Sequence, residues 1–240
     1  MPDIESIEIF AASFSLVFVI ISWVLAALFF IKYYRHKLRQ LLLVGAAWIG
    51  IALPWTSDAI SFIMIYTIGH PLNQYAKVII ELPFLPLAMI LWLMAFTDLK
   101  YQNLKKIIMI IAILFCVMFE IIFLYALIAD FSLIGEYRPP LAIEYSLLFQ
   151  IFLMLILGIF IITGLMLGSE STKSPDEEVK LKGKFLILAF SSFLIASILE
   201  VFLPLHPVGI ILIRVILIFS AIEYYIGFTL PDFIKNLILK

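Results

Sequence analysis

Long apolar stretches, separated by short polar ones, run through almost the whole sequence. A helix needs about 20 consecutive apolar residues to cross the hydrocarbon core of a bilayer. Seven stretches are long enough, at residues 9–31, 41–68, 78–97, 107–129, 141–167, 185–203 and 205–230. The pattern therefore predicts an all-α integral membrane protein, built as a bundle of seven transmembrane helices.

Prolines mark places where this pattern should become irregular. Pro54 lies inside the second stretch, where its missing N–H leaves backbone carbonyl groups free to line a cavity or bind water. Beyond the seventh stretch, Pro231 and Asp232 suit the first turn of a helix. We thus expect a membrane domain at 1–230, followed by a short amphipathic cytoplasmic tail at 231–240.

The amino-acid composition indicates that the chain is surrounded by lipid. Apolar residues make up 65% of the 240 residues and charged residues 14%, with a mean hydropathy of +1.17. Soluble domains have about 45–50% apolar and about 25% charged residues. One soluble core could not bury this excess, so we expect a multi-pass protein of the cell membrane with membrane lipids as its neighbours.

Basic residues are distributed very unevenly between the loops. The loops after the first, third and fifth stretches and the C-terminal tail carry thirteen of them, whereas the opposite side has only Lys77 and Arg138. Lys and Arg are retained on the cytoplasmic side of membrane proteins. This distribution predicts an N-terminus outside and a C-terminus inside. The acidic start of the chain also favours an anchor over a cleaved signal peptide, which would begin with basic residues.

Arg214 lies near the middle of the seventh stretch, where a charged side chain facing lipid would cost about 3 kcal/mol or more. It must therefore face other helices, a carboxylate or water. We counted depth at ~1.5 Å per residue from the outer end of each stretch, and on this count several other polar groups share the outer layer with Arg214. The candidate ligand-binding residues are Trp55, Asp58, Glu81, Glu120, Gln150, Glu200 and Arg214.

This shared depth predicts one cavity that opens outward. The residues expected to line it are Asp58, Glu120, Gln150 and Arg214, with Trp55 in its wall. We expect Arg214 to pair with Asp58 or Glu120, because an unpaired buried guanidinium is expensive. Purely structural roles stay open for the same residues. Glu120 could form a hydrogen bond between helices, and Glu81 and Glu200 could be solvated near the lipid headgroups.

Several kinds of chemistry have no support in the sequence. No His, Cys, Asp or Glu residues show metal-ligand spacing, and no glycine-rich phosphate loop is present. Serines near carboxylates fall short of a nucleophile–base arrangement, so we do not expect an enzyme, a cofactor or a bound metal. The single cysteine, Cys116, excludes an intramolecular disulfide. No basic face with interleaved aromatic residues points to nucleic acid.

The topology resembles that of rhodopsin-like receptors and of the seven-helix sensory regions that precede archaeal and bacterial histidine kinases. Microbial rhodopsins attach retinal to a lysine of the seventh helix, and 205–230 contains none. The kinase-type regions are the nearer match, through helix count, the polar outer layer and the segment Gly227–Pro231, by which the chain leaves the seventh helix. This resemblance implies a receptor-like sensor of a small ligand or cation, with a cytoplasmic signalling partner.

A transporter is the alternative interpretation. The seven stretches also resemble the organisation of small sugar transporters of the SWEET class, with three helices, a linker helix and three more. Asp58 and Glu200 would then occupy similar positions in the two repeats, whose interface holds the substrate site in such proteins. A transporter should give water access to Asp58 from both sides, whereas a receptor should have an outer pocket that is sealed below.

Overall fold

The computed structural model describes residues 2–138, 141–202 and 207–239. In these ranges seven helices are long and apolar enough to cross a membrane, as the sequence pattern predicts. All α-helices of the described ranges, including those too short to cross a membrane alone, are α1 (Pro2–His36), α2 (Arg39–Ile68), α3 (Gln74–Glu81), α4 (Phe84–Leu99), α5 (Lys105–Ala129), α6 (Leu147–Ser171), α7 (Glu177–Phe202), α8 (Pro207–Thr229) and α9 (Asp232–Ile238). Short 3-10 turns, η1 (Gln102–Leu104) and η2 (Phe131–Leu133), and two strands, β1 (Gly135–Arg138) and β2 (Ala142–Tyr145), complete them.

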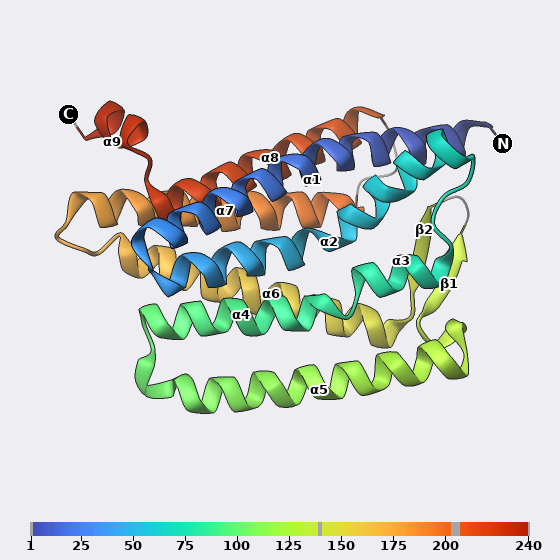
Figure 1. Ribbon diagram of the computed structural model, residues 1–240, viewed down its shortest axis with the longest axis horizontal. Helices are drawn as coiled ribbons and strands as arrows, with labels where there is room; N and C mark the ends of the chain where they lie inside the picture. Colours follow the sequence, from blue (N-terminus) through green and yellow to red (C-terminus); the bar gives the residue numbers. More distant parts are fainter. Residues whose placement is uncertain (1, 139–140, 203–206, 240) are drawn as a thin grey trace.

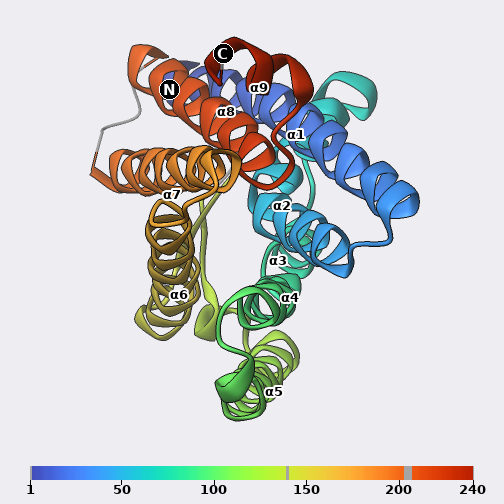
Figure 2. The same cartoon turned by 90° about the vertical axis from the view of Figure 1, so that its left-hand side faces the viewer.

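The long helices run side by side along the long axis of the molecule (Figure 1). The β1–β2 hairpin and the N-terminus lie at one end, which we call the hairpin end, and α9 lies at the other, the α9 end. Viewed along the bundle in Figure 2, α5 is at the rim, next to α4. The closest helix pairs are α1 with α2, α7 with α8, and α2 with α4. This arrangement leaves α2, α4, α6 and α7 around the middle of the bundle.

The third predicted span is one membrane crossing made of two helices. α3 ends at Glu81, and α4 begins at Phe84 after Pro83. Proline lacks the N–H that a continuing helix would need and favours a first helical turn instead. The break displaces α3 from the axis of α4, as Figure 1 shows. It brings one face of α3, with Lys77 and Glu81, against α2.

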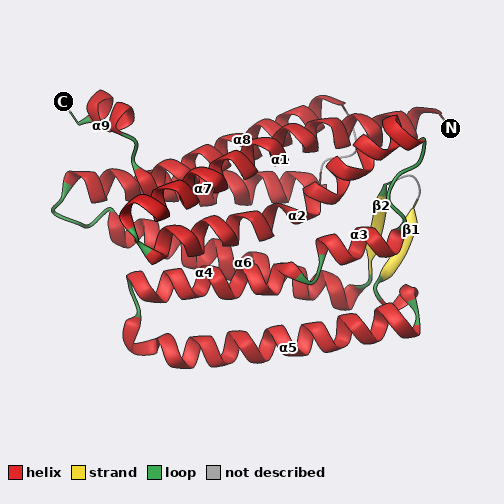
Figure 3. Ribbon diagram, in the orientation of Figure 1, coloured by secondary structure: helices red, strands yellow, loops and turns green. Residues whose placement is uncertain are grey.

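A β-hairpin replaces the predicted start of the fifth span. The sequence pattern put that helix at residue 141, but α6 begins at Leu147, and Ala142–Tyr145 pairs with Gly135–Arg138 in an antiparallel ladder (Figure 3). Gly135 permits this pairing, because a Cβ at that position would lie 2.4 Å from the backbone oxygen of Glu144. The hairpin covers the hairpin end of the bundle without crossing it.

One further helix begins earlier than the sequence pattern predicts, and one short helix lies where the sequence predicts it. α7 begins at Glu177, eight residues before the apolar stretch, so its charged first turns extend past the α9 end of the bundle. There Glu178 pairs with Lys235 of α9 at 2.5 Å. The short helix expected after the seventh span is present as Asp232–Ile238. The connection between α7 and α8, residues 203–206, lies outside the described residues.

Buried aromatic side chains fill the middle of the bundle. Trp48 and Tyr224 stack with ring centroids 4.5 Å apart, and the Trp92 indole donates to Thr163 Oγ1 at 2.7 Å. We call the following set the aromatic layer: Trp48, Trp92, Phe160, Phe190, Phe193 and Tyr224, each at most 2% exposed. It comes from five helices and separates the hairpin half of the bundle from the α9 half.

Candidate functional site

Lys77 is the centre of a buried charged cluster at the hairpin end. Its Nζ lies 2.5 Å from Asp58 Oδ1 of α2 and 2.9 Å from Glu81 Oε1, one turn further along α3. It also donates to Ser57 Oγ at 3.1 Å. The Lys77 side chain is only 5% exposed. Its three donors therefore all have partners, which a buried ammonium group requires.

Glu81 ties this cluster to the hairpin. Its carboxylate accepts hydrogen bonds from the Ser57 hydroxyl and from the Tyr145 hydroxyl at the end of β2. Burial, together with the Glu81 carboxylate, raises the pKa of Tyr145 well above its ordinary value. The hydroxyl therefore stays protonated near neutral pH and donates to the carboxylate. Through this contact the hairpin is fastened over α3.

Arg214 belongs to a second charged cluster, and its partner is Glu200. Arg214 Nη1 lies 2.7 Å from Glu200 Oε1, and the Trp55 indole donates to the same oxygen at 3.4 Å. The predicted pairing of Arg214 with Asp58 or Glu120 is wrong. α7 and α8 are antiparallel neighbours, so Glu200 and Arg214, fourteen residues apart, lie at the same height. The Arg214 side chain is 7% exposed, and its Nε is buried without a hydrogen-bond partner among the described residues.

The two clusters border the same cavities. One cavity of about 610 Å³ lies under the hairpin, with Asp58, Lys77, Glu81, Tyr145 and Glu200 in its lining. A smaller cavity of about 180 Å³, beside α1, is lined by Glu8, Asp58, Glu200 and Arg214 among others. Asp58 and Glu200 border both cavities, with side chains that are 30% and 36% exposed. Acidic groups outnumber basic ones here, so the space favours positive charge.

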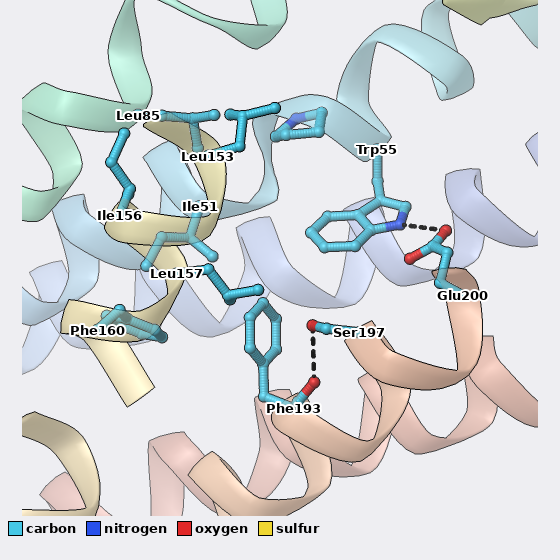
Figure 4. Close-up of a pocket in the computed structure, with 11 residues that line it drawn as sticks. Ile51, Trp55, Leu85, Leu153, Ile156, Leu157, Phe160, Phe193, Ser197 and Glu200 are labelled. Atoms are coloured by element: carbon cyan, nitrogen blue, oxygen red, sulfur yellow. Dashed lines mark hydrogen bonds between the residues drawn. The ribbon is translucent and has the colours of Figure 1, made fainter. Parts of the chain in front are cut away.

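A third, apolar space continues toward the middle of the bundle. This chamber of about 230 Å³ is lined by residues of α2, α4, α6 and α7. Figure 4 shows Trp55 and Glu200 at one side of it, with Leu157 and Phe193 nearby. Phe160 and Phe193 of the aromatic layer form its wall toward the α9 end. The charged cavities and the chamber together make an amphipathic site.

Five of the seven candidate residues line this site, and two do not. Trp55, Asp58, Glu81, Glu200 and Arg214 border the cavities described above.

The prediction that Glu120 and Gln150 line the same cavity is wrong. Glu120 lies on the peripheral helix α5, where it forms no hydrogen bond or ion pair with any residue in the described ranges. Gln150 is in the first turn of α6, is exposed, and donates to the backbone oxygen of Tyr145 at 2.8 Å. Its depth was overestimated because the helix begins six residues later than predicted.

Sequence reasoning underestimated Lys77 and did not find Tyr145. Lys77 was counted among the basic residues of the outer loops, but its spacing of four residues from Glu81 indicates that both share one helix face. Tyr145 carries no such signal, because its role depends on the hairpin. Among the residues that the structure describes, no group of His, Cys, Asp and Glu side chains could hold a metal ion.

Comparison with known proteins gives no family for the chain. No protein-family model matches it, and no curated protein or solved structure is significantly similar to it.

Proposed function

We propose that this multi-pass membrane protein is a receptor-like sensor that binds a small cationic ligand, a protonated amine, in the cavities under the hairpin. The observation that carries the proposal is the excess of carboxylates around these cavities. Lys77 and Arg214 are buried and already paired, whereas Asp58 and Glu200 each expose about a third of their side chains to the cavities. A cation entering there meets two partly exposed carboxylates, each of which is paired with one buried base.

Electrostatics in this setting favour an amine over an anion. Among the described residues that line the two cavities, the acidic ones are Glu8, Asp58, Glu81 and Glu200, and the basic ones are Lys77 and Arg214. Coulombic attraction strengthens as water is excluded, since opposite charges 4 Å apart interact by about 4 kcal/mol at an effective dielectric constant of 20. An ammonium group is attracted to both Asp58 and Glu200, which border the same two cavities, while an anion would be repelled by them.

In the orientation that we propose, this site opens on the outer side of the cell membrane. Basic side chains gather at the α9 end, among them Lys100, Lys173 and Lys235. The positive-inside rule makes that end cytoplasmic. The hairpin end, with the charged cavities, then faces outward, in agreement with the resemblance to the sensory regions of histidine kinases.

The aromatic layer favours sensing over transport. It lies below the apolar chamber, and its side chains are fully packed against one another. Transport would require this layer to part. Binding instead acts through Glu200, because a ligand that competes for this carboxylate loosens Arg214 and with it α8. Since α8 leads directly into α9, the change reaches a signalling partner at the cytoplasmic end.

The test is the binding of ethylammonium to the protein in phosphatidylcholine nanodiscs, measured by calorimetry. We expect Asp58→Asn and Glu200→Gln each to weaken binding about tenfold to a hundredfold, because a hydrogen bond to a charged group contributes roughly 1.5–3 kcal/mol. Glu120→Gln is the matched control, since it removes a carboxylate of α5 that does not line the cavities described above. Equal binding of ethylammonium by the wild type and the three variants would contradict the proposal. An equal loss of binding in Glu120→Gln would contradict it as well.

A further inference from the structure

The apolar chamber is a feature that a small hydrophilic cation would leave unused. Its walls are aliphatic and aromatic side chains, among them Ile51, Leu85, Ile156 and Phe193. It runs along α7 from Glu200 to Phe193, two helical turns, which corresponds to roughly 10 Å of depth. Water has few hydrogen-bond partners in such a space, and apolar cavities of this kind take up apolar ligands.

The chamber adjoins the charged cavity directly. Five residues line both spaces: Pro54, Trp55, Leu85, Leu153 and Glu200. The boundary between them therefore consists of side chains that a single ligand can touch from both sides.

Trp55 lies at this boundary, between the Glu200 carboxylate and the chamber. Its indole N–H reaches Glu200 at 3.4 Å, a long hydrogen bond, and its ring meets Phe18 and Phe193 edge-on with centroids 5.2 and 6.1 Å away. In Figure 4 the indole lies between the Glu200 carboxylate and the apolar side chains of the chamber. An ammonium group bound at Glu200 would replace the indole as hydrogen-bond donor and leave the ring free to turn aside.

We propose that the ligand is a cationic amphiphile, a protonated amine that carries one unbranched apolar group. The ammonium lies between Asp58 and Glu200, and the apolar group passes Trp55 into the chamber. This inference rests on the proposed function and names the chemical class of its ligand. A free amine suits the site better than a phospholipid, because a phosphate would face Glu8, Asp58 and Glu200.

A series of alkylammonium ions tests this inference. The affinities of ethyl-, butyl- and hexylammonium are measured on the intact protein in phosphatidylcholine nanodiscs, with hexanol and hexanoate as uncharged and anionic probes. We expect the affinity of the amines to rise about fourfold per added methylene, the factor that corresponds to roughly 0.8 kcal/mol per buried CH₂. Hexanol and hexanoate should bind at least tenfold more weakly than hexylammonium.

Two variants of one chamber residue locate the apolar group. Ser197 lines the chamber, and its hydroxyl only donates to the backbone oxygen of Phe193, at 2.8 Å. Ser197→Leu fills the chamber, so we expect it to weaken hexylammonium binding at least tenfold and to leave ethylammonium binding unchanged. Ser197→Ala removes the hydroxyl but keeps the space, and it should leave the affinity of both amines unchanged.

The possible outcomes separate the two proposals. If ethylammonium binds but hexylammonium binds no more tightly, or if Ser197→Leu lowers both affinities equally, the chamber does not hold the ligand and only this inference fails. If no amine binds to the wild-type protein, the proposed function fails as well. A melting curve of each variant that matches the wild type shows that the protein is folded.

Discussion

Lys77 and Arg214, both buried among the long helices, are neutralised in different ways. Lys77 has two carboxylates and a hydroxyl around its ammonium group. Arg214 has one carboxylate, Glu200, and one buried N–H that lacks a partner among the described residues. The Lys77 cluster is therefore a rigid support for the site. The Arg214 pair has fewer contacts holding it, and a ligand can disturb it more easily.

Arg214 is more deeply buried than Glu200, so removing one partner of this pair should cost more stability than removing the other. Glu200→Ala should lower the free energy of unfolding by about 3 kcal/mol, because it leaves a buried guanidinium uncompensated. Arg214→Met should cost less, since the Glu200 carboxylate is partly exposed to the cavity and can be hydrated. Unfolding in mixed micelles, followed by circular dichroism, measures both values.

A double-mutant cycle supplies the control for that prediction. Arg214→Met combined with Glu200→Ala should be less destabilising than the sum of the single changes, whereas Arg214→Met combined with Glu120→Gln should be additive. Coupling between Arg214 and Glu120 would contradict the pairing described above.

At the scale of the elements, apolar length predicted the helices well and their ends less well. Residues 141–143 are apolar and lie only a few residues before α6, so apolar length alone could not distinguish a strand from a helix there. Counting depth also has a limit, because it gives height along a helix but not direction around its axis. Asp58 and Glu120 were placed at similar heights, yet Asp58 borders the cavities and Glu120 lies on the peripheral α5.

The hairpin gives a testable prediction at this scale. Gly135→Ala should destabilise the hairpin and loosen the Tyr145 contact, because the added Cβ would collide with the backbone of β2. Gly158→Ala is the matched control. Apart from its chain neighbours and the backbone of its own helix, no atom lies within 4 Å of its Cβ position, and alanine is favoured over glycine in a helix by about 1 kcal/mol. A lower melting temperature for Gly135→Ala alone is the expected result, and equal melting temperatures would contradict it.

At the scale of the whole molecule, the bundle has two chemically distinct ends. Acidic groups surround the cavities at the hairpin end, and ion pairs of lysines with Glu170 and Glu178 lie at the α9 end. The sequence already indicated this separation through its basic loops. The connection between the ends, from Glu200 through Arg214 along α8, could not be predicted, because it depends on which helices are neighbours.

The proposed orientation is tested by labelling single cysteines in intact cells. On a Cys116→Ala background, Arg138→Cys should react with a membrane-impermeant maleimide, whereas Lys173→Cys should react only after the cells are opened. Both native side chains are well exposed, at 61% and 67%, so accessibility within the protein does not limit the reaction. Reaction of both cysteines from the same side would refute the topology.

The location of the ion pairs also bears on how the chain enters the membrane during synthesis. Lys77 meets Asp58, and Arg214 meets Glu200, and in each case the acid lies on the membrane-crossing segment just before that of the base. Each buried base is thus neutralised within a pair of consecutive membrane-crossing segments. A translocon can release such a pair into lipid without holding an unpaired cation until a distant helix has been translated. The most polar parts of the protein are in this way compatible with stepwise insertion, two segments at a time.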